Sequence, residues 1–317
     1  MKAFQRPMTR AQFLRLATRL GLAGAAAGTL SPLAALAQAK PVLRRPIPSS
    51  GELLPVVGVG TAVVYEIEST DPKFPNLVDS VRAFLENEGR LIDTSPTYGR
   101  AEKNLGEIFK RIGATRDKTF IATKISTTGE AAGIRQYEAS LRDMGVAKLD
   151  LLQVHNVRDT ATHLRTIRRL RDEGKVRYVG ITTSFDNTYD EFERILRTEK
   201  LDFVQIDYAL DNRNAEERIL PLARDLGMAV IINLPFGRGR LFAKARGREL
   251  PAFAKDYDTG SWAQFFLKFL LANPAVTVVM PGTDRPEFAI DNLNAARGRI
   301  PDAKQRQQMI DYWDRLG

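Results

Sequence analysis

The chain contains, in order, the segments Leu91-Ile-Asp-Thr-Ser-Pro-Thr-Tyr98, Thr119-Phe-Ile-Ala-Thr-Lys124 and Leu149-Asp-Leu-Leu-Gln-Val-His155. Each contains a short aliphatic or β-branched run, which is typical of a buried β-strand, and each closes on polar residues. Helical stretches separate the three segments. Strands that alternate with helices predict a parallel sheet whose strand ends meet on one face. We therefore expect the polar side chains Asp93, Tyr98, Lys124 and His155 to share one pocket.

The same alternation extends over most of the chain. Amphipathic helical stretches separate the short apolar runs, and the one from Thr160 to Glu173 places Leu164, Ile167 and Leu170 on a single stripe. On that helix we expect the arginines and His163 to be exposed. Eight strands are predicted: Val56 to Thr61, Leu91 to Asp93, Thr119 to Lys124, Leu149 to His155, Val176 to Thr182, Phe203 to Ile206, Ala229 to Leu234 and Thr277 to Met280.

Eight such units predict an α/β fold that closes into one (β/α)8 TIM barrel. An open doubly wound sheet is the alternative, but Gly58-Val59-Gly60 lacks the longer glycine pattern that a Rossmann fold needs after its first strand. The turn signal Pro48-Ser49-Ser50-Gly51 predicts an N-terminal β-hairpin that covers the barrel floor. A C-terminal helix is expected from Asp302, with Trp313 on its apolar side.

Charge gives little reason to expect a nucleic-acid partner. The net charge is +9, but five of the 47 basic residues lie in the first 39 positions, where no acidic residue occurs. Without that segment the chain has 42 basic and 38 acidic residues, a net charge of +4. The basic character therefore comes largely from the N-terminus and not from a binding face.

Residues 1–39 have the composition of a signal peptide, which leaves the barrel to residues 40–317. A basic stretch ends at Arg19, an uncharged stretch rich in Ala and Gly follows, and Ala37-Gln38-Ala39 resembles a cleavage site. The pattern from Thr9 to Arg15 resembles a twin-arginine motif in which Ala11 replaces the second arginine. These features predict export to the periplasm. An uncleaved membrane anchor is the alternative, although the glycines and Pro32 make a poor spanning helix.

The chain resembles the aldo-keto reductase family over residues 45–300. No single motif is specific, but all of them occur in order and at family-like spacing. The matching pieces are Gly58-Val-Gly-Thr61, Asp93-Thr-Ser-Pro-Thr-Tyr98-Gly99 with Glu102 and Gly106, Lys124, Gln153-Val-His155, Gly180-Ile-Thr182, Gln205, Pro235, and Pro281-Gly282-Thr283 with Asn292.

This resemblance implies a catalytic tetrad of Tyr98, Lys124, Asp93 and His155. A carbonyl that accepts hydride needs a proton on its oxygen, and a phenol with a reference pKa of about 10 releases its proton more readily beside an ammonium group. In this arrangement Tyr98 is the general acid, Lys124 stabilises its phenolate, and Asp93 holds Lys124. The fourth member, His155, orients the substrate carbonyl.

The resemblance also implies a nicotinamide cofactor, most often NADPH in this family, with NADH as the other candidate. Arg285 is the expected partner of a 2′-phosphate, because a guanidinium binds phosphate through two parallel hydrogen bonds. The expected contacts are Thr61, Asp93, Thr182, Thr183, Gln205, Asn233 and Pro235 toward the nicotinamide half, and Thr283, Arg285 and Asn292 toward the adenosine half.

Two departures from the family pattern keep a second interpretation open. Thr182-Thr183 replaces the usual Ser-Asn pair, and Asn233 replaces the aromatic residue that stacks on nicotinamide, with Phe236 as a possible substitute. The chain is therefore interpreted either as a reductase of a small carbonyl compound or as a cofactor-binding sensor or scaffold without turnover. With two histidines and no cysteine, no metal site is expected, and a metal-dependent or carboxylate-dependent hydrolase or isomerase lacks its ligands.

Overall fold

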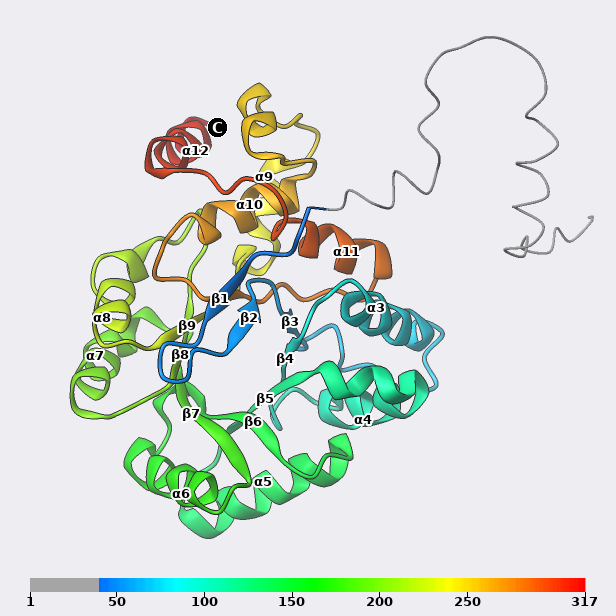
Figure 1. Cartoon of the computed structure of the whole chain (residues 1–317), viewed down its shortest axis with the longest axis vertical. Coiled ribbons are helices and arrows are strands. Elements are labelled where there is room, and N and C mark those ends of the chain that lie inside the picture. The colour runs from blue at the N-terminus through cyan, green and yellow to red at the C-terminus, as the bar shows by residue number, and fades with distance from the viewer. Residues whose placement is uncertain (1–39, 317) are drawn as a thin grey trace, which may run out of the picture. The chain divides into compact units, whose positions relative to one another are not determined.

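The computed structural model of the protein describes residues 40–316, so the predicted signal peptide lies outside the described residues. Parallel strands form a ring with helices around it (Figure 1). The eight strands are β3 (Val59–Gly60), β4 (Leu91–Asp93), β5 (Phe120–Ile125), β6 (Leu149–Val154), β7 (Val176–Thr182), β8 (Phe203–Asp207), β9 (Ala229–Asn233) and β10 (Val278–Val279). Each strand pairs in parallel with its sequence neighbour from β3 to β10.

The ring closes between its first and last segments. The Gly58 N–H donates to the Val279 carbonyl oxygen at 2.9 Å, and the Val279 N–H donates to the Val56 carbonyl oxygen at 2.9 Å. Val57 and Val279 form a parallel bridge at the same place. The predicted barrel is therefore confirmed, and the predicted strand positions hold, although only Val59–Gly60 of the first segment forms a regular strand.

A helix follows each strand and packs outside the ring. These helices are α3 (Phe74–Glu86), α4 (Ala101–Ile112), α5 (Glu130–Met144), α6 (Thr160–Asp172), α7 (Tyr189–Thr198), α8 (Ile219–Asp225), α10 (Trp262–Leu271) and α11 (Pro286–Asn294), with α9 (Arg240–Ala245) inserted after β9. Short 3-10 turns are η1 (Gly113–Lys118), η2 (His155–Val157), η3 (Asp186–Thr188), η4 (Asn214–Glu216), η5 (Gly237–Gly239) and η6 (Ala252–Tyr257). None of the helices described for residues 40–316 has the length and apolar character needed to cross a bilayer.

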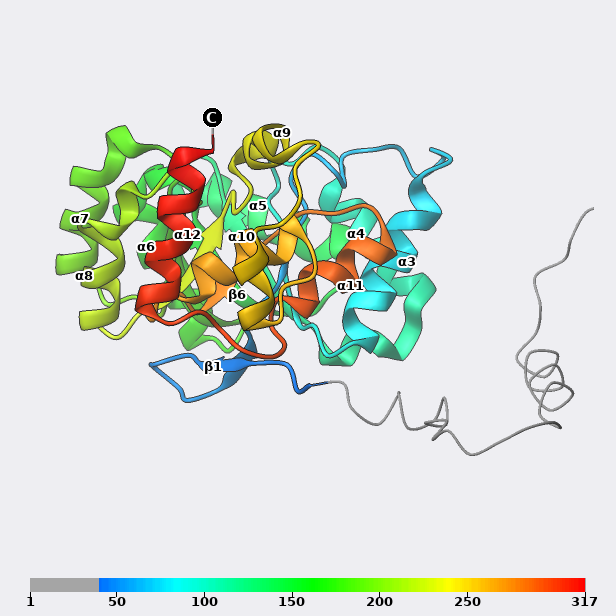
Figure 2. The same cartoon turned by 90° about the horizontal axis from the view of Figure 1, so that it is seen from above.

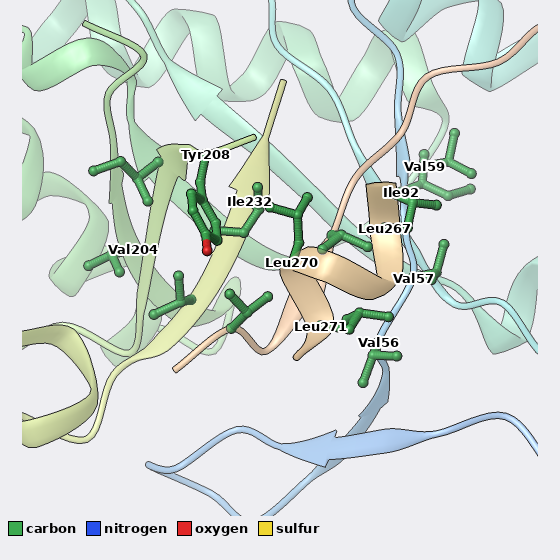
Figure 3. Close-up of a cluster of buried hydrophobic side chains, with 14 of the residues drawn as sticks. Val56, Val57, Val59, Ile92, Val204, Tyr208, Ile232, Leu267, Leu270 and Leu271 are labelled. Carbon is green, nitrogen blue, oxygen red and sulfur yellow. The ribbon is translucent and has the colours of Figure 1, made fainter. Parts of the chain in front are cut away.

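Two apolar layers lie on opposite sides of the strands. Outside the ring, valines and isoleucines from the strands pack against Leu267, Leu270 and Leu271 of α10 (Figure 3). Inside the ring, Phe120, Tyr178 and Phe203 pack against one another with ring centroids 5.5–5.9 Å apart. Successive residues of a strand point to opposite faces, so this alternation decides which residue of each strand faces the barrel axis.

The N-terminal hairpin covers the floor of the barrel, as predicted. It pairs β1 (Arg44–Pro46) with β2 (Leu53–Pro55), and β1 lies on the side of the barrel opposite α9 (Figure 2). Ile47 and Leu54 are fully buried against the inner aromatic layer. The Tyr178 hydroxyl donates to Glu52 Oε2 at 2.9 Å, which ties the hairpin to β7.

The terminal helix α12 (Ala303–Arg315) packs its predicted apolar side against α10. Trp313 is buried, and its ring meets the ring of Phe266 edge-on at 5.4 Å. Asp302 caps the helix, because its side chain accepts from the Gln305 N–H and the Gln305 side chain accepts from the Asp302 N–H.

Candidate active site

Along the strands, the residues that face the barrel axis change from apolar to polar at the mouth of the barrel. In β5 the inward residues are Phe120, Ala122 and then Lys124, and β4 ends on inward Asp93. Parallel pairing sets Lys124 opposite Gln153 of β6. One register therefore brings an acid, a cation and an amide from three strands to the same level above the apolar layer.

Lys124 and Asp93 form a buried ion pair. The Lys124 ammonium is fully buried and donates to Asp93 Oδ2 at 2.5 Å and to the Thr94 carbonyl oxygen at 2.7 Å. Gln153 Nε2 donates to Asp93 Oδ1 at 3.1 Å, so both carboxylate oxygens have a partner. Burial disfavours the charge on Lys124, but the attraction of Asp93, aided by Tyr98, outweighs it and raises the pKa of Lys124.

Tyr98 lies above this pair, on the turn between β4 and α4. The Lys124 ammonium nitrogen lies 5.0 Å from the centre of the Tyr98 ring. The Tyr98 and His155 rings meet edge to face, with centroids 5.9 Å apart and an interplanar angle of 82°. Gly99 follows with φ 50°, and a Cβ there would lie 3.3 Å from Glu66 Cβ, so glycine suits the turn that presents Tyr98.

His155 follows β6 and faces two serine hydroxyls. Its Nδ1 lies 3.0 Å from Ser126 Oγ and 3.3 Å from Ser95 Oγ. Burial lowers the pKa of His155 from 6.5 to about 3, and the positive charges of Lys124 and Arg158 add to the effect. The imidazole is therefore neutral at physiological pH.

Replacing His155 with glutamine is expected to weaken the pH dependence of folding. The pKa of His155 is about 3 in the folded protein and 6.5 in the unfolded chain, so below pH 6.5 only the unfolded chain gains this proton. Stability is therefore lost as the pH falls, by about 2 kcal/mol between pH 7 and pH 5. Urea unfolding at both pH values should show a smaller loss of stability in His155→Gln than in the wild type. Equal losses in the two proteins would contradict the assignment.

Residues that sequence reasoning missed surround the tetrad. Ser95, Ser126 and Gln153 touch its members directly, although none was assigned to the site. Strand alternation was a usable signal for Gln153, because it lies two residues before His155 and so faces the same way. Behind Lys124, the buried carboxyl of Glu102 accepts from Thr123 Oγ1 at 2.6 Å and from Ser140 Oγ at 2.9 Å.

One sequence expectation about exposure is wrong. His163 was expected on the solvent side of α6 but is fully buried, and its Nε2 lies 2.8 Å from the Thr127 carbonyl oxygen. His163 lies on the same buried stripe of α6 as Ile167 and Leu170. Gly133 leaves room for its ring, because a Cβ at position 133 would lie 2.8 Å from the imidazole.

The predicted cofactor contacts of the nicotinamide half lie along neighbouring strand ends. Thr182 pairs in register with Gln205, and the Thr183 N–H donates to the Gln205 carbonyl oxygen at 3.0 Å. Asn233 Nδ2 donates to the Thr183 carbonyl oxygen at 3.3 Å. On the other side of the mouth, the Thr61 N–H donates to the Asp93 carbonyl oxygen at 3.1 Å. Pro235 is buried just after β9.

Two hydroxyls of this group already have partners within the protein. Thr182 Oγ1 accepts from the Asn156 N–H at 3.1 Å and holds the segment after His155, where Asn156 and Val157 both have φ 50°. Thr183 Oγ1 lies 2.6 Å from Thr188 Oγ1.

Phe236 packs its ring against Phe242 at 4.8 Å, as part of an aromatic cluster with Phe266.

Three buried polar atoms at the mouth have no hydrogen-bond partner in the part of the chain that the structure describes. They are Thr61 Oγ1, Gln153 Oε1 and Asn233 Oδ1. Leaving such atoms unpaired is costly, and they occur where a ligand or an ordered water completes the site. The mouth therefore offers unfilled hydrogen-bonding capacity on both sides of the tetrad.

Of the adenosine-half candidates, Thr283 and Arg285 lie just before α11, and Asn292 lies near the end of that helix. Thr283 and Asn292 are buried, and Arg285 is exposed, with its guanidinium carbon 5.2 Å from the centre of the Phe288 ring. The Thr283 hydroxyl accepts from the Arg285 N–H at 3.2 Å, which fixes the turn before the helix. Within residues 40–316, no cluster of His, Cys, Asp and Glu is arranged to hold a metal ion.

Comparison with known proteins agrees with this architecture. Aldo-keto reductase YhdN of Bacillus subtilis is 29% identical over 185 residues, which cover 53% of this chain and 54% of that protein, so the match spans about half of that relative. An aldo/keto reductase from Klebsiella pneumoniae in complex with NADP and acetate has a TM-score of 0.71 at 21% identity, over 83% of this chain and 93% of that one. The glycerol dehydrogenase AKR11B4 of Gluconobacter oxydans has a TM-score of 0.71 at 22% identity, over 86% and 95% of the two chains.

The two structural neighbours, at these identities, show a shared fold. The family assignment comes from the sequence model described as the aldo/keto reductase family, which matches residues 57–311. That range begins in the first barrel segment and ends in α12. It therefore includes all four tetrad residues and every predicted cofactor contact, and the chain belongs to the aldo/keto reductase family.

Proposed function

We propose that this protein reduces an aldehyde or ketone to an alcohol with NADPH, with Tyr98 as the general acid. The observation that carries the proposal is the stack of Asp93, Lys124 and Tyr98. A fully buried ammonium, 2.5 Å from a carboxylate, lies 5.0 Å from the ring of a half-buried phenol at the barrel mouth. A purely structural ion pair has no need of a phenol at that position.

When bound, the nicotinamide cofactor supplies the hydride. The protein's own residues manage the proton. Tyr98 donates its hydroxyl proton to the carbonyl oxygen, and the positive charge of Lys124 stabilises the phenolate that remains. Asp93 keeps Lys124 charged, and Gln153 fixes the carboxylate that does so. His155, neutral because burial lowers its pKa, acts as a hydrogen-bond donor to the carbonyl oxygen and not as a cation.

The unpaired atoms at the mouth fit a nicotinamide ring system. A carboxamide has both N–H donors and a carbonyl acceptor, so it matches the free Asn233 Oδ1 and the free Thr61 hydroxyl. A further structure of similar fold, an aldo-keto reductase from Klebsiella pneumoniae, was solved in complex with NADPH, which supports this choice of cofactor. In this proposal Thr61, Asp93, Thr182, Thr183, Gln205, Asn233 and Pro235 hold the nicotinamide half, and Thr283, Arg285 and Asn292 hold the adenosine half.

Replacing Arg285 with alanine is expected to weaken NADPH binding by about 10- to 100-fold and NADH binding little. A charge-assisted hydrogen bond to phosphate contributes roughly 1.5–3 kcal/mol, and only NADPH has the 2′-phosphate. Fluorescence titration of both cofactors measures the two dissociation constants. Arg197→Ala, at an exposed position on α7, is the matched control. Equal weakening of NADPH and NADH would remove Arg285 from this role.

The proposal is tested by titrating the purified protein with NADPH and then following cofactor absorbance during exposure to a panel of aldehydes and ketones. Binding followed by carbonyl-dependent oxidation of NADPH supports a reductase. Absence of binding to either dinucleotide would overturn the proposal. The panel should include short aldehydes, sugars, ketosteroids and quinone-like carbonyls.

A sensor or scaffold that binds the cofactor without turnover is the second candidate. The observation that favours it concerns the expected stacking ring. Position 233 is an asparagine and not an aromatic residue, and the Phe236 ring already packs against Phe242. Without a stacking ring the nicotinamide loses apolar contact. Tight binding with no oxidation across the whole panel would favour this second function.

We also propose that residues 1–39 direct export to the periplasm, with cleavage after Ala39. Their basic start, uncharged middle and Ala37-Gln38-Ala39 support this. Mass spectrometry of the protein purified from the periplasmic fraction should find Lys40 at the N-terminus. Recovery of the protein from the membrane fraction with residues 1–39 still attached would favour the membrane anchor instead.

A further inference from the structure

The His155 ring is held on one side by two serines from different loops. Ser126 directly follows β5, and Ser95 lies two residues after β4, yet both hydroxyl oxygens lie within 3.3 Å of the same nitrogen, Nδ1. No protein partner is present for the other nitrogen, Nε2, among residues 40–316. The ring is therefore fixed through Nδ1 and presents Nε2 as its open hydrogen-bonding position.

Ser126 is held firmly in place. Its backbone N–H donates to Gln136 Oε1 at 2.6 Å, and its carbonyl oxygen accepts from Arg158 Nη1 at 3.4 Å. Ser95 is fixed in a similar way, because its Oγ accepts from the Thr97 N–H at 3.3 Å and lies 2.9 Å from Thr97 Oγ1. The two hydroxyls thus meet Nδ1 from positions that their own loops determine.

The proton count favours one direction for the Ser126 bond. A neutral imidazole has one N–H donor and one acceptor nitrogen, and a serine hydroxyl has one proton to donate. Within the described part of the chain, the structure gives the Ser126 hydroxyl no acceptor other than His155 Nδ1. If Nδ1 had the ring proton, the Ser126 proton would have no partner in the protein.

We propose that Ser126, assisted by Ser95, is a positioning residue that holds His155 in the tautomer with its proton on Nε2. The ring then presents an N–H, and not a lone pair, from its open side. This inference rests on the proposed function for its consequence, because an Nε2–H is the form that donates to a substrate carbonyl oxygen. The tautomer itself is a property of the protein without substrate.

The test is a long-range proton–nitrogen NMR spectrum of protein labelled with ¹⁵N-histidine. The chain has two histidines, so the spectrum shows two rings, and His155→Gln assigns them. His163 is an internal reference, because its Nε2 must have the proton to donate to the Thr127 carbonyl oxygen. We expect His155 to show the same tautomer as His163 in the wild-type protein.

Removing both hydroxyls with Ser95→Ala and Ser126→Ala should convert the His155 signals to those of a mixture of tautomers. The His163 signals should stay unchanged and so report an intact fold. Ser126→Thr keeps a hydroxyl and should restore the wild-type pattern. Ser50→Ala, which removes a serine hydroxyl on the barrel floor, is the control and should leave the His155 signals unchanged. A proton on Nδ1 in the wild type, or an unchanged tautomer in the double variant, would overturn the proposal.

Turnover gives a second, separate readout. With an active carbonyl substrate, the double variant should lower kcat about 3- to 10-fold, the size expected for one lost hydrogen bond, with NADPH affinity unchanged. Ser126→Thr should recover the rate. If no carbonyl is reduced, the proposed function fails while the NMR result still decides the tautomer. If the tautomer shifts without any change in kcat, the positioning role is refuted.

Discussion

Tyr98→Phe is expected to lower kcat for carbonyl reduction by about 10²- to 10⁴-fold, the usual contribution of a general acid. The substitution removes one oxygen and leaves the ring that lies over Lys124 and against His155. NADPH affinity should stay close to the wild-type value, because the hydroxyl is a proton donor and not a proposed cofactor contact.

Steady-state kinetics and a fluorescence titration of NADPH check both parts of this prediction. Tyr312→Phe is the matched control, because Tyr312 is not a member of the tetrad and packs its ring edge-on against Phe253. Wild-type kcat in Tyr98→Phe would exclude Tyr98 as the acid. An equal loss in the control would point to a general effect on folding.

Asp93→Asn is expected to lower the free energy of unfolding by about 3–5 kcal/mol, because it leaves the buried Lys124 ammonium without its countercharge. The pair is nearly inaccessible to water, with the Lys124 side chain 0% and the Asp93 side chain 4% exposed. Removing both charges with Asp93→Asn and Lys124→Met should cost less than the sum of the single changes, since no lone buried charge remains.

Urea unfolding of the two single variants and the double variant gives the coupling free energy. The exposed pair of Lys110 and Glu107 on α4, with its atoms 2.8 Å apart, is the control and should contribute little to stability. Additive effects of Asp93→Asn and Lys124→Met would mean that the two groups do not interact as charges. All three variants at the buried pair should lose most of their reductase activity.

The barrel and the position of the tetrad were predictable from local pattern. Apolar runs of strand length alternate with amphipathic helices, and the pattern repeats eight times. Because parallel strands end on one face, Asp93, Lys124 and His155 had to lie at the same mouth. Strand alternation also accounts for Gln153, which shares the inward row with His155.

The sequence by itself determined the fold class, the order of the strands and the face on which the polar residues gather, because these depend on periods of about two and 3.6 residues. Only the tertiary structure decided which atoms meet. Ser95 and Ser126 reach one nitrogen of His155, Thr182 binds the Asn156 N–H, and His163 is buried in a space that Gly133 leaves open. These contacts depend on loop conformations, including the positive φ of Asn156 and Val157. Such a conformation is rare for a β-branched residue, and packing of the closed barrel, not local preference, holds it in place.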